Sequence, residues 1–104
     1  MIDHIVLCRL DPDHDPQALQ AVMAGLAGLV GTLPGFLSFA HGPNLDLEAR
    51  SPGFGYGFRA TFADRDALGA YAADPEHQRL GAALVDLCAD GINGLFIADL
   101  DHVA

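Results

Sequence analysis

The sequence predicts an α+β fold built on an antiparallel sheet. Four segments have the alternation and the β-branched or aromatic residues of strands, and the segments between them have helical spacing. Their order is β-α-β-β-α-α-β, which suits a ferredoxin-like sandwich with helices on one side of the sheet. The chain has 104 residues, 51% of them hydrophobic, which fits one domain over residues 1–104 with its own core.

The first strand and the first helix follow from alternation and capping. Residues 2–10 alternate and are predicted to form a strand. In the loop "DPDHDP", Asp15 can cap a helix whose first residue is Pro16. We expect this helix to continue as far as "LPG" at 33–35. Its apolar residues at helical spacing are Leu19, Val22, Met23, Leu26, Val30 and Leu33.

The middle of the chain is predicted to form two strands joined by a loop. Residues 36–42 are the first of these strands, and residues 43–53 are a loop that contains Pro, Gly and Ser. The next strand is "FGYGFRATF", residues 54–62, whose alternation places every second side chain on one face. That face is expected to carry Phe54, Tyr56, Phe58, Ala60 and Phe62.

Two helices and a strand complete the predicted order. Asp64 can cap a short helix that runs to about Ala72. The Asp-Pro pair at 74–75 starts a second helix, from Glu76 to about Ala89. The closing strand is "GLFIADLDH".

Both faces of the predicted sheet are apolar, which predicts a homodimer. In the first strand Val6 and Cys8 share a face with His4, whereas Ile5 and Leu7 lie on the other face. The closing strand also has apolar residues on both faces. One helical layer covers only one face, and soluble monomers seldom leave a large apolar patch in water. The expected partner is therefore a second copy that packs sheet to sheet.

Charge and composition argue against several classes of partner. The formal charge is −9 and all five basic residues are arginines, so we expect binding neither to nucleic acid nor to a membrane surface. The first apolar run, "IVLC", lacks the basic leader and cleavage site of a signal peptide. Cys8 and Cys88 lie in apolar surroundings and are expected to be reduced, buried thiols of a cytoplasmic protein.

The stretch "AYAADPEHQRL" places a tyrosine and a histidine on apolar stripes. Tyr71 follows Leu68 by three positions and His77 precedes Leu80 by three, so both rings are expected to face the interior, as is His4. Each ring taken alone is explained by a hydrogen bond in the core. Three such rings together are instead typical of an apolar ligand pocket with a few polar groups.

We expect no metal ion and no other cofactor. "DPDHD" begins like a calcium loop, but Pro16 stands where the loop glycine belongs and no glutamate closes the loop. "GFGYGF" lacks the basic residue and the helix that follow a phosphate-binding loop. His14, His41 and His102 show no metal-ligand spacing and are expected to be solvated.

Three stretches together resemble a known family. With "MIDHIVLCRL", "LPGFLSFAHGPN" and "ALGAYAADPEHQRL", the chain resembles the stress-responsive A/B barrel (Dabb) family over essentially its whole length. The resemblance implies ferredoxin-like chains that dimerise through their sheets into an α+β barrel. One member, a plant polyketide cyclase, closes a linear tetraketide by aldol condensation and retains the carboxylate.

The resemblance also implies roles for individual residues. His77 matches the general base of the cyclase, Tyr71 matches the tyrosine that binds or orients the substrate, and His4 is a second pocket imidazole. The substrate-binding residues expected with the pair are His4, Val6, Tyr56 and Phe58. Histidine can remove a proton next to a carbonyl near neutral pH, and a phenol can donate a hydrogen bond to the resulting enolate.

The chain departs from the cyclase in its pocket lining. Tyr56 stands where the cyclase has another pocket histidine. The first helix has Val22, Met23 and Leu26 where the cyclase has large aromatic residues. The glycines expected to make that helix slimmer still are Gly25, Gly28 and Gly31.

Three functions remain open from the sequence. The first is a cofactor-free enzyme that acts on a carbonyl-bearing or polyketide-like molecule. The second is a non-catalytic protein that binds a small apolar ligand or is associated with stress. The third is a cofactor-independent oxygenase. A shared fold alone does not separate them.

Overall fold

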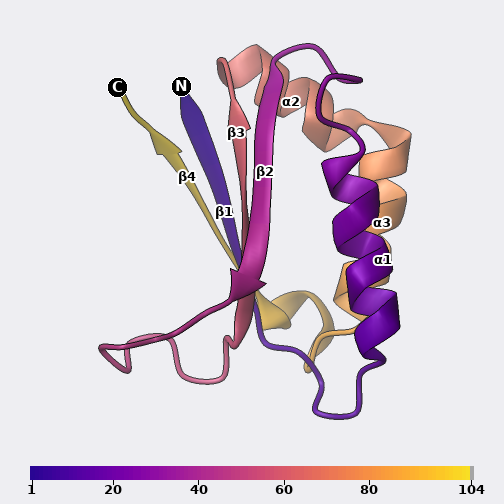
Figure 1. Cartoon of the computed structure of the whole chain (residues 1–104), viewed down its shortest axis with the longest axis vertical. Coiled ribbons are helices and arrows are strands. Elements are labelled where there is room, and N and C mark those ends of the chain that lie inside the picture. Colours follow the sequence, from indigo (N-terminus) through magenta and orange to yellow (C-terminus); the bar gives the residue numbers. More distant parts are fainter. Residues whose placement is uncertain (104) are drawn as a thin grey trace.

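A computed structural model describes residues 1–103, which fold as a sheet with helices on one side (Figure 1). The strands are β1 (Ile2–Cys8), β2 (Phe36–Pro43), β3 (Tyr56–Phe62) and β4 (Leu95–Asp101). The helices are α1 (Pro16–Ala27), α2 (Arg65–Ala73) and α3 (Pro75–Asp86), and a short 3-10 turn, η1 (Gly91–Gly94), precedes β4. The predicted α+β class and the predicted order of elements are confirmed.

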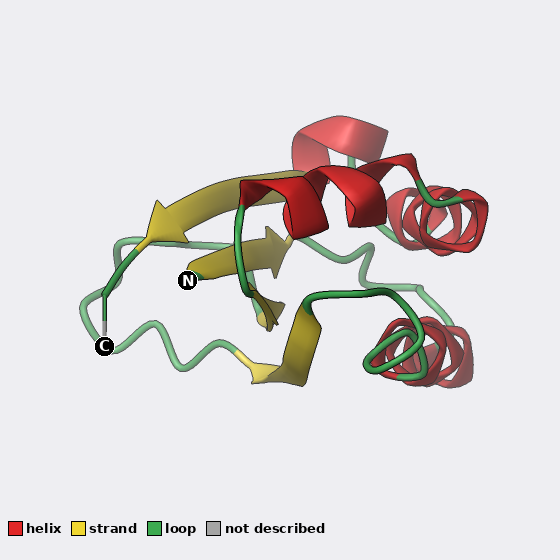
Figure 2. Cartoon of the chain, turned by 90° about the horizontal axis from the view of Figure 1, so that it is seen from above, coloured by secondary structure: helices red, strands yellow, loops and turns green. Residues whose placement is uncertain are grey.

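The strands form one antiparallel sheet in the order β2-β3-β1-β4. His4, on the inner strand β1, lies opposite Ala60 of β3 and Asp99 of β4. Because side chains alternate along a strand, this register places all three on the face that the helices cover. Figure 2, seen from above, shows α1 and α3 end-on beside each other on that side of the sheet.

Each helix begins after an aspartate whose carboxylate accepts a backbone N–H. Asp15 and Asp64 cap α1 and α2 as predicted, each with a hydrogen bond of 2.9 Å. Asp74 ends α2, and its carboxylate accepts the N–H of His77 over 2.9 Å. Pro75 occupies the first turn of α3, where its missing N–H is not needed. Asp74 is thus the single residue between α2, which carries Tyr71, and α3, which carries His77.

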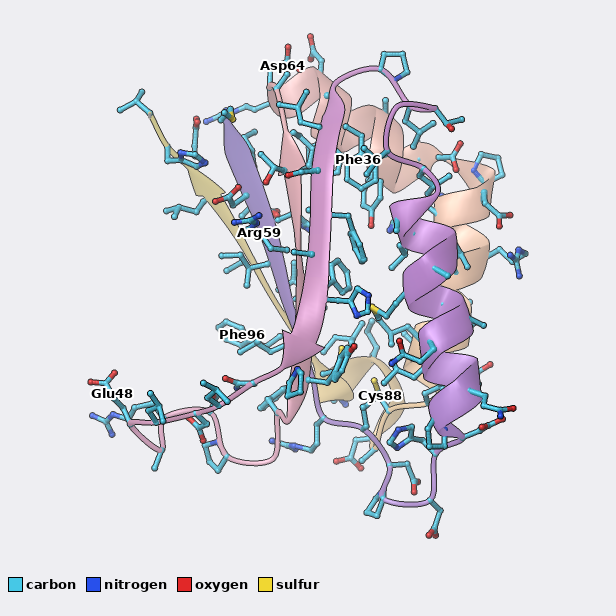
Figure 3. All side chains as sticks on the ribbon, in the orientation of Figure 1. Phe36, Glu48, Arg59, Asp64, Cys88 and Phe96 are labelled. Carbon is cyan, nitrogen blue, oxygen red and sulfur yellow. The ribbon has the colours of Figure 1, made fainter. Side chains whose placement is uncertain are left out.

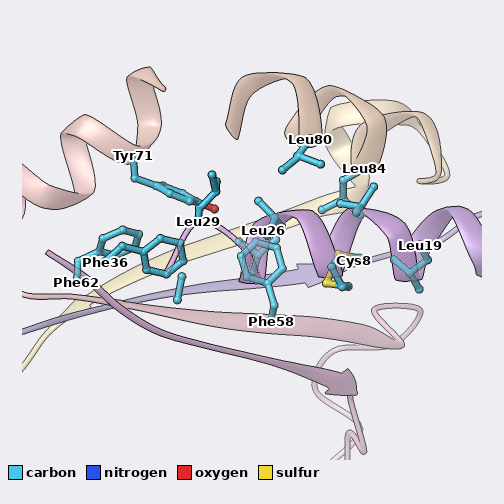
Figure 4. Packing of buried hydrophobic residues seen from close by; sticks show 14 of the residues in the cluster. Cys8, Leu19, Leu26, Leu29, Phe36, Phe58, Phe62, Tyr71, Leu80 and Leu84 are labelled. Carbon is cyan, nitrogen blue, oxygen red and sulfur yellow. The ribbon is translucent and has the colours of Figure 1, made fainter. Parts of the chain in front are cut away.

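The core between the sheet and the helices is rich in aromatic rings (Figure 4). Phe36 and Phe62 stack with their ring centroids 4.7 Å apart, and Tyr71 meets Phe36 edge-on at 5.2 Å. Cys8 and Cys88 are free and buried, and burial raises the pKa of Cys8 to about 12. The candidate functional site lies against this aromatic part of the core.

The first helix is shorter than the periodicity predicts. It ends at Ala27 with Gly28 as its C-cap, and the later apolar residues Val30 and Leu33 pair with each other in the turn that follows. Gly28 and Gly31 therefore lie outside the helix. Gly25 lies inside α1, where an added Cβ would stand 2.7 Å from the Leu80 Cδ2 atom. Its small size serves the contact between α1 and α3 rather than the width of a pocket.

The third strand also begins later than predicted, at Tyr56 rather than Phe54. Phe54 consequently leaves the predicted face: its ring lies 6.5 Å from that of Phe96 and under the Arg9 guanidinium at 4.6 Å. At other boundaries β1 ends at Cys8 instead of residue 10, and α3 ends at Asp86 instead of residue 89.

The face of the sheet opposite the helices, here called the outer face, is open. Phe96 and Leu100 of β4 are 58% and 55% exposed on this face. In Figure 3, Arg59 and Phe96 lie on this side of the sheet, whereas Phe36 points toward the helices. The outer face consists of Asp3, Ile5, Leu7, Ser38, Ala40, Gly42, Gly57, Arg59, Thr61, Phe96, Ala98 and Leu100. Within residues 1–103, every helix is too short or too polar to cross a membrane.

Candidate functional site

A pocket of about 550 Å³ opens between the sheet and α2, at the end where β1 begins and β4 ends. Its walls come from β1, α2, the first turn of α3 and β4. Apolar groups such as Ile2 and Leu68 make up part of the lining. Its polar and charged side chains are His4, Arg65, Tyr71, His77, Asp99 and Asp101.

Three rings predicted from the sequence meet at this pocket. Tyr71 and His77 meet across the Asp-Pro break, with ring centroids 3.9 Å apart and ring planes tilted by 36°. His4 approaches Tyr71 from β1 with a centroid separation of 5.8 Å. Figure 4 shows Tyr71 extending from α2 over Phe36 and Phe62, so its ring is part of the core as well as of the pocket wall.

Two polar atoms of this cluster have no protein partner. The hydroxyl of Tyr71 and the Nδ1 atom of His77 are buried, and neither forms a hydrogen bond of standard geometry with any of residues 1–103. A buried polar group without a partner is rare in native proteins and costs about 1–3 kcal/mol. An unpaired donor beside an unpaired imidazole nitrogen is an arrangement that a polar ligand can satisfy.

Burial keeps both of these side chains uncharged. It raises the pKa of Tyr71 well above the usual value of a phenol, so the hydroxyl stays a hydrogen-bond donor. Burial is also the main cause that lowers the pKa of His77, and the nearby Ala72 carbonyl partly opposes it. His77 is therefore a neutral imidazole near pH 7, which is the form that accepts a proton.

His4 is oriented by the carboxylate of Asp99, which was not among the predicted site residues. Its Nδ1 atom lies 2.6 Å from the Oδ1 atom of Asp99, and its side chain is only 13% exposed. In the tautomer protonated on Nδ1, the ring donates to this carboxylate and Nε2 is left as an acceptor. Asp99 was detectable in principle, because "FIAD" places it on the same face of the closing strand as Ile97.

Val6, Phe58 and Tyr56 do not line the pocket, although the Phe58 ring lies 6.1 Å from that of His4. Val6 and Phe58 are directly opposite each other on β1 and β3 and are packed into the core, with 2% and 7% exposure. Tyr56 pairs with Cys8, four positions along β1 from His4, and its hydroxyl shares a hydrogen bond of 2.6 Å with Nδ1 of His41. At about 3.3 Å per residue this places Tyr56 roughly 13 Å along the strand from His4.

The remaining histidines have local partners. His14 forms a hydrogen bond of 2.7 Å with the Asp11 carbonyl, within the loop before α1. His102 lies 3.3 Å from a carboxylate oxygen of Asp3. Among residues 1–103, no three His, Cys, Asp or Glu side chains gather closely enough to hold a metal ion.

The fold agrees with the family whose model matches the sequence. The model of the stress responsive A/B barrel domain matches residues 2–100. The chain belongs to this family. A curated member, the stress-response A/B barrel domain-containing protein HS1 of Arabidopsis thaliana, is 25% identical over 76 residues, which cover 73% of this chain and 70% of HS1.

Solved structures of other proteins share the whole fold. A dimeric ferredoxin-like protein of unknown function from Jannaschia sp. CCS1 is 40% identical, with a TM-score of 0.91 over 97% of this chain and 98% of that one. A variant of SnoaB, a cofactor-independent oxygenase from Streptomyces nogalater, is 18% identical, with a TM-score of 0.74 over 97% of this chain and 91% of that one. The likeness to SnoaB extends to the fold alone.

Proposed function

We propose that this A/B barrel protein binds a small carbonyl-bearing molecule and catalyses cofactor-free acid–base chemistry on it. In this proposal His77 is the general base, Tyr71 donates a hydrogen bond to the carbonyl oxygen, and His4 is a second imidazole held by Asp99. Val6, Tyr56 and Phe58 are left out because they do not line the pocket. We further propose that the protein acts in the cytoplasm, in line with its two free, buried thiols.

One observation carries the proposal. The unpaired hydroxyl of Tyr71 and the unpaired Nδ1 of His77 belong to two contacting rings that line the same pocket. A residue that served packing alone would satisfy its polar atoms or be replaced by an apolar residue of the same shape. A ligand with a carbonyl oxygen and an acidic C–H would complete both hydrogen-bonding groups at once.

The chemistry follows from the charge states of the two groups. Neutral His77 removes a proton from the carbon next to the carbonyl and becomes an imidazolium, while the C–H electron pair forms an enolate. The protonated phenol of Tyr71 donates to the enolate oxygen, where the negative charge develops. The enolate then takes a proton back from the imidazolium, or it attacks a second carbonyl carbon of the same molecule. In the second route the attacked carbonyl oxygen becomes an alkoxide, which takes the proton from the imidazolium. Neither route needs an electron acceptor.

A turnover screen tests this function. Wild-type protein is incubated with β-polyketide and related carbonyl compounds, beside His77→Ala and the matched control His14→Ala in the loop before α1. Loss of a general base typically lowers the rate by about 10²–10⁴-fold, so His77→Ala should lose most turnover and His14→Ala should keep it. Full activity in His77→Ala would place the base elsewhere.

The alternative function is binding without turnover. This alternative is favoured by the burial of Tyr71, which is only 1% exposed and is part of the aromatic core. Native mass spectrometry of freshly purified protein would report a co-purified molecule together with the number of subunits. Tight binding of an apolar ligand, with no turnover across the carbonyl panel, would favour the binding protein. Dioxygen-dependent turnover without a cofactor would favour an oxygenase.

We also propose that the protein is a homodimer formed through the outer face. Ile5 and Leu7 stand near the middle of that face, and Phe96 and Leu100 extend it toward the edge strand β4. A soluble monomer seldom exposes several large apolar side chains on one face. The Jannaschia protein, 40% identical over nearly the whole chain, is described as dimeric, which supports the same assembly here.

A further inference from the structure

Two glycines form a hollow on the outer face. Gly42 of β2 and Gly57 of β3 lie directly opposite each other, and a depression of about 480 Å³ lies over them. Its walls include Ile5, Leu7 and Arg59. Two facing strand residues without side chains are the reason the surface is low here.

Only one of the two glycines is required by the packing of its own chain. A Cβ at Gly57 would lie 2.8 Å from both the Leu7 Cδ2 atom and the Val6 carbonyl oxygen. A Cβ at Gly42 would have no atom of residues 1–103 within 4 Å, apart from its chain neighbours. Glycine inside a strand costs about 0.5–1 kcal/mol relative to alanine and often marks a close approach by another molecule. Packing within residues 1–103 therefore does not require a glycine at position 42.

The loop between β2 and β3, residues 44–55, presents two leucines to solvent. Leu45 and Leu47 are 77% and 88% exposed. The loop projects from the end of the sheet toward the side of the outer face, away from the helices, with Glu48 near its tip (Figures 1 and 3). Apolar side chains placed this far from the core of their own chain are typical of a contact with another molecule.

The loop is held in one conformation by its own hydrogen bonds. The Asp46 carboxylate accepts the N–H groups of Arg50 and Ser51, each over 2.9 Å, and the Asn44 side chain donates to the Phe54 carbonyl over 2.8 Å. Asp46 adopts the left-handed conformation with φ of 46°. A strained position of this kind costs about 1–3 kcal/mol and persists only where the surroundings fix it. The leucines are thus presented on a preorganised support.

We propose that the leucines of this loop in one protomer seat in the Gly42–Gly57 hollow of a second copy. The inference rests on the proposed homodimer and specifies how its two subunits lock together. Packed sheets lie about 10 Å apart, so a loop that projects past the outer face must meet the partner. The loop leucines and the hollow lie on the same side of one chain, so a two-fold axis can bring each loop to the hollow of the other subunit. Glu48, in the loop beside the leucines, and Arg59, in the wall of the hollow, have opposite charges.

The dimer dissociation constant tests this contact. Sedimentation velocity over a dilution series is run on the full-length wild type, on the double variant Leu45→Ser/Leu47→Ser, and on Gly42→Leu, which fills the hollow. The matched control is Ile92→Ser, because Ile92 is a similarly exposed apolar residue, 64% exposed, in η1. Each of the two test variants should weaken the dimer by about tenfold or more, and the control should not. Combining loop and hollow changes should add little, because both remove one contact.

The outcomes separate this inference from the dimer itself. A wild type that is monomeric at micromolar concentration overturns both. A wild-type dimer whose dissociation constant is unchanged by the loop variant overturns the seated leucines and leaves the sheet-to-sheet dimer standing. If Gly42→Leu disturbs β2, the loop variant alone still tests the contact, because both leucines are exposed and their replacement leaves the core intact.

Discussion

The rings of Tyr71 and His77 are in contact, with their centroids 3.9 Å apart and their planes tilted by 36°, although an Asp-Pro helix break separates them in the chain. The break brings the rings together, because α2 ends and α3 begins at Asp74, whose carboxylate caps the N–H of His77 itself. The same residue that starts the helix therefore fixes the position of the imidazole. A short helix followed at once by another gives the pocket a rigid pair of polar rings.

The unpaired hydroxyl of Tyr71 predicts a conflict between stability and function. Tyr71→Phe keeps the ring and removes a buried donor without a protein partner, so the free energy of unfolding should stay the same or rise by about 1 kcal/mol. Ligand binding or turnover should fall in the same variant. Urea denaturation gives the first quantity. A clear loss of stability in Tyr71→Phe would mean that the hydroxyl has a structural partner.

The buried imidazole of His77 predicts a dependence of stability on pH. Burial lowers the pKa of His77 in the folded state below its usual value of 6.5, so the unfolded chain binds this proton first as the pH falls. The contribution of neutral His77 is therefore fully present above that value and is lost as the pH falls from it toward the folded pKa. His4 and Asp74, the charged or titratable neighbours of the ring, remain in place in a His77 variant.

The measurement compares two proteins at two pH values. Wild type should lose more free energy of unfolding than His77→Leu when the pH falls from about 7.5 to about 5, because leucine cannot titrate. The difference between the two proteins isolates His77 from the other groups that titrate in this range. Equal losses in the two proteins would show that the imidazole is not desolvated in the folded state.

Asp99 predicts the tautomer of His4. In Asp99→Asn the carboxylate that accepts the Nδ1 proton is gone, so the neutral ring should shift toward the form protonated on Nε2. Nitrogen-15 NMR of the ring distinguishes the two forms. Stability should change by less than about 1 kcal/mol, because Asp99 is 46% exposed and solvent screens the pair. An unchanged ring spectrum would remove Asp99 as the residue that positions His4.

A charge at position 7 tests whether the outer face is the dimer interface. Leu7→Asp places a charge in the centre of the proposed interface, where it would be buried without a partner at a cost of several kcal/mol. Light scattering should then report monomers or aggregates, whereas the exposed Ile92→Ser variant should remain dimeric. A dimer of wild-type affinity in Leu7→Asp would move the interface away from the outer face.

Local patterns were sufficient for most of the fold and for the three rings. Alternation assigned His4 to the covered face, and spacing from apolar neighbours turned Tyr71 and His77 inward, because both periodicities follow from backbone geometry. The end of α1 was misplaced because Val30 and Leu33 continue the helical spacing by chance while packing in a turn. Spacing alone did not separate a helix from a turn that buries the same residues.

The rest of the site depended on register between distant strands. Asp99 meets His4 only because β4 pairs with β1 at that position, and a single chain does not specify which aspartate of the closing strand will do so. Tyr56 faces the helices as predicted, but its place along β3 brings it to His41 instead of the pocket. The sequence alone predicted the face of a strand reliably and the position along it poorly.

His77 is proposed to remove a proton next to a carbonyl. Deuterium exchange measures that step in simple carbonyl compounds, so the natural substrate need not be known. Methyl ketones and β-keto acids are incubated in heavy water with wild type, His77→Ala or His14→Ala, and loss of the α-proton is followed by NMR. Wild type and His14→Ala should exchange the bound probe well above the buffer rate. In His77→Ala the excess should fall by about 10²–10⁴-fold. Probes that bind in the pocket yet exchange no faster than in buffer, or equally fast with His77→Ala, would contradict the account.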